Sequence, residues 1–144
     1  MTENDFRFRH SELIEFYQLI EMRLKGICAE FVADEEKGWF DRLDDYESDS
    51  FGLLLKETKK LQKQKQIDLL TQEEFSILDE IRKKRNFWVH QCFGLYPIVF
   101  KKGELRHSES GKKLCLDLDE AKEWDRKLTE TTRKLTQINT TSDN

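Results

Sequence analysis

One apolar pattern near the start of the sequence most constrains what this chain can fold into. Within residues 11–31, large apolar side chains recur at alternating steps of four and three residues: Leu13, Tyr17, Ile20, Leu24, Ile27 and Phe31. Residues at these steps lie on one face of an α-helix, because each residue turns the helix by about 100°. Such a helix is stable when other elements cover its apolar face. The pattern therefore predicts a helical bundle whose first helix starts near residues 10–11, with Ser11 as N-cap.

The chain contains few residues that interrupt helices. Its 144 residues include 6 glycines and 1 proline, while 38% of the residues are charged and 37% are hydrophobic. This composition favours long amphipathic helices over a sheet protein. A chain of this length forms one domain with its own core. We therefore expect a single domain over residues 1–144, with an ordered core at 10–138 and a frayed polar tail at 139–144.

Similar apolar patterns predict three further helices. The second spans residues 51–65 and follows Ser50, whose hydroxyl can cap it. The third spans residues 71–93 and opens on a Thr-Gln-Glu-Glu capping box. The last helix is capped by Asp117 or Asp119, and its apolar face again advances by steps of three and four: Ala121, Trp124, Leu128, Thr131, Leu135 and Ile138.

Two segments connect these helices. Residues 33–50 are acidic, and we expect a loop with a short helical turn at 39–43, whose aromatic residues hold it against the bundle. Residues 95–100 are the one β-like stretch, and they can form a hairpin with 105–107 or with 114–116. The predicted fold class is therefore all-α, a four- to five-helix up-down bundle with a small β-hairpin between the last two helices.

Cysteine usage and hydropathy favour a cytoplasmic protein. The three cysteines are widely spaced and form no paired motif, which suits reduced, buried thiols: Cys28, Cys92 and Cys115. The first residues are acidic and polar, unlike a signal peptide, and no apolar run is long enough to span a bilayer. A net charge of −4 argues against a protein that coats nucleic acid indiscriminately.

Most familiar catalytic and metal-binding patterns are absent from the sequence. It contains no Gly-rich phosphate loop, no serine elbow and no Cys or His pair at zinc spacing, so we expect no metal and no cofactor. His10 and His107 stand in terminal or loop context and are expected at the surface. Capping and solvation explain the aspartate pairs at 44–45 and 117–119 better than cation binding does.

The segment at residues 82–90 departs from ordinary bundle design. It reads Arg-Lys-Lys-Arg-Asn-Phe-Trp-Val-His and falls late in the third predicted helix. The helical periodicity requires an apolar side chain where Arg85 stands. In α-helical geometry His90 lies roughly 140° around the axis from Arg85, with Asn86 between them in angle. The helix thus combines a cation on its apolar face with an amide and an imidazole on the adjoining flank.

Two explanations of these residues are open. In a structural explanation, Arg85 pairs with a glutamate of the first helix and His90 caps a backbone carbonyl. In a functional explanation, they bind or act on a ligand. Two features favour function: an unpaired charge in a core costs several kcal/mol, and Phe87 and Trp88 supply aromatic surface of the kind found at interfaces and in nucleotide pockets.

The functional explanation fits RNA cleavage. RNA carries its own nucleophile, the 2′-hydroxyl, so cleavage requires only proton transfer and stabilisation of the phosphate charge. His90 can transfer protons, Arg85 can hold two phosphate oxygens, and Asn86 can orient either group. A homodimer would supply the second acid or base. Nearby basic residues are expected to bind the RNA backbone: Arg82, Lys83, Lys84, Lys59 and Lys63.

The segment at residues 85–90, Arg-Asn-Phe-Trp-Val-His, matches the R-x4-H motif of HEPN domains, and the order of elements from about residue 11 to 138 resembles theirs. The resemblance implies a helical bundle that dimerises with both motifs facing each other. It also implies metal-independent endoribonuclease activity, often as a toxin or phage-defence factor beside an antitoxin. Under this resemblance Arg85 and His90 are catalytic and Asn86 supports them.

The resemblance leaves two points open. It implies an acidic partner on the first helix, for which Glu15 and Glu21 are both candidates. Some HEPN domains have lost activity, so a non-catalytic module that binds a protein partner, a nucleotide or a regulator is a second possible function. A transcriptional co-regulator would need a partner already on DNA, since the sequence has no helix-turn-helix pattern.

Overall fold

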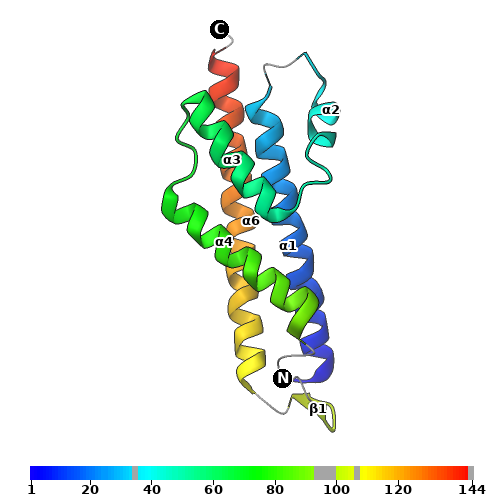
Figure 1. The fold of residues 1–144 in the computed structure, drawn as a ribbon. Coiled ribbons are helices and arrows are strands. Elements are labelled where there is room, and N and C mark those ends of the chain that lie inside the picture. Colours follow the sequence, from blue (N-terminus) through cyan, green and yellow to red (C-terminus); the bar gives the residue numbers. More distant parts are fainter. Residues whose placement is uncertain (34–35, 93–99, 106–107, 143–144) are drawn as a thin grey trace.

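The protein folds into an elongated bundle of helices (Figure 1). The computed structural model describes residues 1–33, 36–92, 100–105 and 108–142. Its elements follow in this order: α1 (Glu3–Phe31), α2 (Trp39–Asp44), α3 (Phe51–Lys65), α4 (Gln72–Asn86), a π-helical turn η1 (Phe87–Gln91), β1 (Phe100–Lys101), β2 (Glu104–Leu105) and α6 (Ser108–Ser142). The predicted all-α bundle with a small β-hairpin between its last two helices is confirmed.

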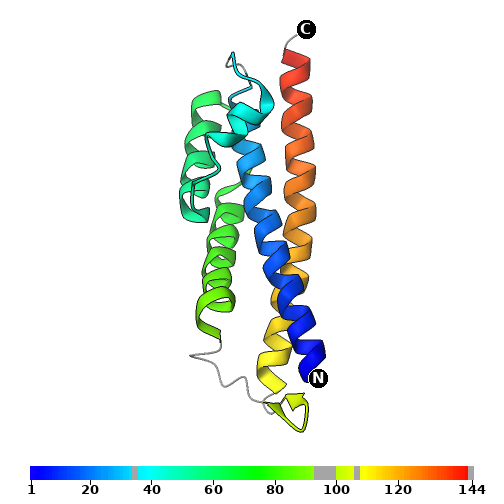
Figure 2. The same cartoon turned by 90° about the vertical axis from the view of Figure 1, so that its right-hand side faces the viewer.

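The two long helices, α1 and α6, lie side by side and run in the same direction (Figure 1). Polar contacts join them at separate points along their length. Lys122 Nζ lies 3.0 Å from Glu12 Oε1, and Asn139 Nδ2 donates to the backbone oxygen of Glu30 at 2.8 Å. The shorter helix α3 runs in this same direction, whereas α4 runs the opposite way. Figure 2 shows α3 and α4 covering successive lengths of the long pair.

The core consists of the apolar faces that the sequence predicts. None of the six residues of the first pattern is more than 4% exposed. Full burial of an apolar side chain of this size stabilises the fold by roughly 1.5–3 kcal/mol. The other helices add buried side chains of their own: Phe51, Leu54 and Leu61 from α3, Phe75, Leu78 and Ile81 from α4, and Leu114, Trp124, Leu128 and Leu135 from α6.

The predicted start of α1 at Ser11 is wrong, because Thr2 caps the helix. The Oγ1 atom of Thr2 accepts a hydrogen bond from the Asp5 N–H at 3.1 Å. Phe6 is fully buried and His10 is half-buried, so the apolar face continues toward the N-terminus at the same steps of four and three. A histidine within the pattern concealed this extension from the sequence prediction.

α6 begins at Ser108, so the predicted cap at Asp117 or Asp119 is wrong. Leu114 and Leu118 are buried and extend the last helical face toward the N-terminus. The hairpin alternative at 114–116 is excluded, because those residues are helical. Residues 139–142 are helical as well, rather than a frayed tail.

The hairpin closes the bundle beside the first turn of α1. Phe100 pairs with Leu105, in agreement with the first hairpin alternative, although most of the predicted β-like stretch lies outside the described residues. In the turn, Gly103 has a φ of 77°, which glycine adopts without strain. The Glu3 N–H donates to the Gly103 carbonyl at 2.7 Å, and the Leu105 N–H donates to the Met1 carbonyl at 2.9 Å. The hairpin thereby satisfies one of the free backbone donors at the helix start.

The described part of residues 33–50 contains the predicted short helix, α2. Trp39 packs over Gly26 of α1, where an added Cβ would lie 4.0 Å from Trp39 Cη2. Arg42 Nε also ties this segment to α1, by donating to the Ala29 carbonyl at 3.0 Å. Phe40 is 77% exposed, so it does not hold the segment in place as we expected of the aromatic residues.

A glutamine side chain holds the turn between α3 and α4. Gln62 Oε1 accepts from the N–H groups of Leu69 and Leu70, at 3.2 and 2.9 Å, and Gln62 Nε2 donates to the Leu70 carbonyl at 2.8 Å. The predicted bounds and cap of α3 are confirmed. The predicted capping box of α4, between Thr71 and Glu74, is confirmed too.

We predict that Gln62→Ala lowers the free energy of unfolding by roughly 1–3 kcal/mol, because it leaves partly buried backbone groups without partners. Urea denaturation followed by circular dichroism measures the loss. Gln64→Ala on the same helix is the matched control, since Gln64 is exposed. Equal losses in the two variants would contradict the role of Gln62.

Candidate functional site

Arg85 lies between α4 and α1, where it pairs with a glutamate. Its Nη2 atom is 3.5 Å from Oε2 of Glu21, and the side chains are 28% and 16% exposed. The ion pair of the structural explanation is therefore confirmed, because the guanidinium does not stand alone in the core. Of the two candidate acidic residues, Glu21 makes the contact, whereas Glu15 is exposed.

The helix that carries the motif changes geometry after Asn86. In η1 the Cys92 N–H bonds to the Phe87 carbonyl, five residues back instead of four, so the prediction of uniform α-helix is wrong in this turn. A π turn rotates less per residue than an α turn. His90 therefore comes closer in angle to Arg85 than the roughly 140° of α-helical geometry. Single π turns of this kind are frequent at functional sites.

The Trp88 carbonyl links this turn to α1. It accepts a hydrogen bond from His10 Nε2 at 2.8 Å and a second from Cys92 Sγ at 3.3 Å. Because a carbonyl can only accept, His10 Nε2 carries a proton. The imidazole also stacks on Phe6, with ring centroids 6.4 Å apart. The prediction of a surface His10 is wrong, and the carbonyl-capping role considered for His90 belongs to His10.

His90 and Asn86 lie at the surface and at its edge. The His90 side chain is exposed and Asn86 is half-buried. Within the described part of the chain, neither side chain has a hydrogen-bond or ion-pair partner. Both are thus available to a ligand that reaches this end of α4. His107, the remaining histidine, lies outside the described residues.

A partly buried polar network joins the motif to α6. Trp88 Nε1 donates to Asp117 Oδ2 at 2.7 Å, and Asp117 is 6% exposed. Lys84 Nζ lies 3.7 Å from Asp117 Oδ1 and donates to Glu120 Oε1 at 2.8 Å. Burial alone would lower the pKa of Lys84, but the hydrogen bond and charge of Glu120, with the charge of Asp117, raise it above its ordinary value. Asp117 interrupts an apolar face as Arg85 does, and this signal in the sequence could have identified it.

The hydroxyl of Tyr17 is buried near this network. Tyr17 is 1% exposed, and no described residue forms a hydrogen bond with its hydroxyl. Burial, followed by the negative charges of Asp117 and Glu120, raises the pKa of Tyr17 far above its ordinary value of 10. The folded protein therefore keeps this phenol neutral.

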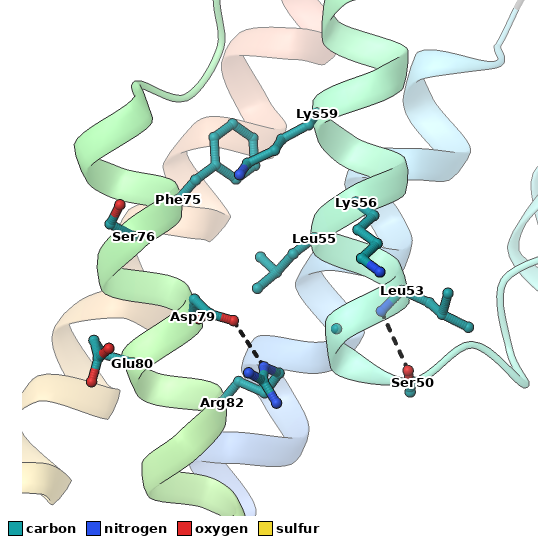
Figure 3. Close-up of a pocket in the computed structure, with 11 residues that line it drawn as sticks. Ser50, Leu53, Leu55, Lys56, Lys59, Phe75, Ser76, Asp79, Glu80 and Arg82 are labelled. Carbon is teal, nitrogen blue, oxygen red and sulfur yellow. Dashed lines mark hydrogen bonds and ion pairs between the residues drawn. The ribbon is translucent and has the colours of Figure 1, made fainter.

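The basic residues predicted to bind RNA do not form one surface. Lys59 and Arg82 line a groove between α3 and α4 (Figure 3). Lys83 pairs with a carboxylate of its own helix at 3.0 Å, and Lys84 pairs with Glu120 of α6 at 2.8 Å. Lys63 is exposed on the last turn of α3 and does not line the groove. Of the five residues, the structure brings together Lys59 and Arg82.

Comparisons with known proteins find no matching family model, no similar curated protein and no matching solved structure. In the described residues, no group of three or more His, Cys, Asp or Glu side chains is placed to hold a metal ion. No helix among them combines the length and apolar composition needed to cross a membrane. The resemblance to HEPN domains therefore rests on the motif and the order of elements in this chain.

We predict that Asp117→Ala lowers the free energy of unfolding by about 1–3 kcal/mol, because the buried indole N–H of Trp88 loses its acceptor. Asp119→Ala is the matched control. Asp119 is exposed on the same helix, so we expect a change within about 0.5 kcal/mol. Chemical denaturation of both variants measures the difference, and a loss at Asp119 as large as at Asp117 would refute the network.

We predict a stability loss in base that depends on Tyr17. The pKa of Tyr17 in the folded state lies above the unfolded value of about 10. The contribution of the neutral Tyr17 to the free energy of unfolding is therefore fully present below pH 10 and is lost as the pH rises above it. The free energy of unfolding should therefore fall less steeply above pH 10 in Tyr17→Phe than in the wild type. Urea denaturation across this range measures both slopes, and identical slopes would contradict the prediction.

Proposed function

We propose that the protein is a metal-independent endoribonuclease that cleaves single-stranded RNA by attack of the 2′-hydroxyl. One observation carries the proposal. His90 is exposed on the π turn that follows α4, and the Arg85 side chain on the same helix is 28% exposed to solvent. A transferable proton and a planar cation are the two groups that this chemistry requires.

The proposed reaction assigns one step to each group. Neutral His90 takes the proton of the 2′-hydroxyl as its oxygen attacks phosphorus, and Arg85 stabilises the charge that develops on the phosphate oxygens. The bond to the 5′-oxygen breaks, which leaves a 2′,3′-cyclic phosphate, and the leaving oxygen takes a proton from a second, charged histidine. Each chain has one His90, so the proposal requires a homodimer in which two motifs share one cleft. Asn86 orients the reacting groups.

The Arg85–Glu21 pair is compatible with this role. At 3.5 Å the contact is longer than a good charge-assisted hydrogen bond, so an incoming phosphate can compete for the guanidinium. In the proposal, Arg82, Lys83, Lys84, Lys59 and Lys63 steer RNA toward the cleft. A cytoplasmic toxin or phage-defence factor, controlled by an antitoxin, is the biological role that the HEPN resemblance suggests.

A second function is favoured by the same ion pair. Glu21 gives Arg85 a structural partner within one chain, so a catalytic task is not needed to explain a cation at this position. The alternative is a non-catalytic helical module that binds a protein partner, a nucleotide or a regulator. It predicts binding without turnover, and binding that is insensitive to His90→Ala.

The purified protein should cleave single-stranded RNA in the presence of a chelator. We expect His90→Ala to reduce the rate about 10²- to 10⁴-fold, the usual contribution of a general acid or base. Arg85→Ala should have a comparable effect. Arg85→Ala is tested alone and together with Glu21→Gln. The double variant separates the effect of leaving the Glu21 carboxylate unpaired from the effect of removing the Arg85 charge.

Arg126→Ala is the control for a surface arginine, since Arg126 is exposed on α6. Circular dichroism and thermal melting establish that every variant is folded. Cleavage that survives in folded His90→Ala would exclude the assigned chemistry. If the wild type cleaves no single-stranded RNA with or without chelator, the non-catalytic alternative is favoured.

A further inference from the structure

The groove between α3 and α4 is a separate feature of the molecule (Figure 3). It has a volume of about 650 Å³, within the usual range for small-molecule sites. The first turns of α3 and the middle of α4 form its walls. Neither Arg85 nor His90 lines it, so the groove lies apart from the proposed cleavage residues.

The side chains that line the groove carry a small excess of positive charge. Three cations line it: Lys56 and Lys59 from α3, and Arg82 from α4. Two carboxylates line it as well, Asp79 and Glu80, and Glu80 bonds to Lys83 at 3.0 Å. The Asp79 carboxylate bonds to one of the three cations, Arg82.

The Asp79 carboxylate occupies the position beside Arg82 where an anionic ligand could bind. Its Oδ1 accepts from Arg82 Nε at 2.9 Å. The hydrogen bond from Arg82 and the positive charges of Arg82, Lys83 and Lys59 lower the pKa of Asp79, so the carboxylate is ionised. Neither Lys56 nor Lys59 forms an ion pair with any residue that the structure describes, which leaves positive charge to be matched by a ligand.

Two of the three cationic side chains are held in place by packing. The Arg82 stem lies against Gly52, where an added Cβ would be 3.5 Å from Arg82 Cδ. Lys59 crosses from α3 with its Nζ 5.2 Å from the centre of the Phe75 ring. Figure 3 shows these two cations reaching into the groove from opposite walls. Leu53, 52% exposed, offers an apolar surface at the rim.

We infer that this groove binds the phosphate ester of a nucleotide. The phosphate displaces Asp79 from Arg82 and is held by Arg82 and Lys56, while the nucleoside lies against Leu53. The nucleotide can be free, or it can be one nucleotide within an RNA strand, since both present the same ester. Asp79 therefore acts as an internal competitor that weakens binding.

Isothermal titration of the full-length protein with three probes tests the inference. The probes are adenosine 5′-monophosphate, inorganic phosphate and a 2′-O-methylated RNA oligonucleotide, which lacks the nucleophile and cannot be cut. We expect Lys56→Gln and Arg82→Gln to weaken nucleotide binding roughly tenfold each, as for loss of a charged hydrogen bond. Asp79→Asn should tighten it several-fold.

Lys60→Gln is the matched control, because Lys60 is exposed on α3 but does not line the groove. If the monophosphate and the oligonucleotide both bind with this variant pattern, the groove accepts a free nucleotide. If only the oligonucleotide does, the ligand is an RNA strand. Binding should also persist in His90→Ala, which separates this site from cleavage.

Three results would overturn the inference. The first is no binding of any probe. The second is binding that Lys56→Gln leaves unchanged; this variant alters an exposed side chain, so it is informative even if Arg82→Gln unfolds. The third is binding of inorganic phosphate alone, since the groove would then lack any surface for the nucleoside.

Discussion

Trp88 joins three helices, and the geometry of the site depends on it. Its side chain is completely buried, its indole N–H donates to Asp117 of α6 at 2.7 Å, and its carbonyl accepts from His10 of α1 at 2.8 Å. The residue itself lies in η1, the continuation of α4. Through these bonds the shorter helix is fixed on both long helices at once, which determines where the exposed His90 stands.

Ion pairs compensate for the charges that this arrangement places in or near the core. Arg85 meets Glu21, and Lys84 lies between Asp117 and Glu120. Asp117 is the buried member, and a buried charge without a partner would cost several kcal/mol, so it requires its neighbours to be in place. Pairing of this kind specifies how α4 sits on α1 and α6, beyond what apolar packing determines. The groove between α3 and α4 differs, since two of its three cations have no ion-pair partner in the described structure.

The sequence predicts the bundle well, because apolar residues at steps of three and four determine where helices form and which face they bury. It predicts helix ends less well. The starts of α1 and α6 lie earlier than expected because His10 and Asp117 occupy apolar-face positions, and polar residues there look like interruptions. The π turn was not predictable, since no local pattern in residues 87–91 marks it; in the structure, the Trp88 carbonyl within it is bonded from another helix. The groove depends on how two helices lie against each other, which local patterns do not encode.

The motif residues were likewise predictable in part from the sequence. Periodicity correctly placed Arg85 toward the core, and either of two glutamates could have been its partner until the packing of α1 on α4 selected Glu21. Exposure of His90 could not be derived, because α-helical geometry holds only up to Asn86. Catalysis remains our proposal, and its central claim is that two motifs form one cleft. A crystal structure of the protein assembled in solution tests this most directly. We predict a dimer in which both His90 side chains and both Arg85 side chains line a single cleft; two His90 side chains far apart, each facing solvent alone, would contradict the account.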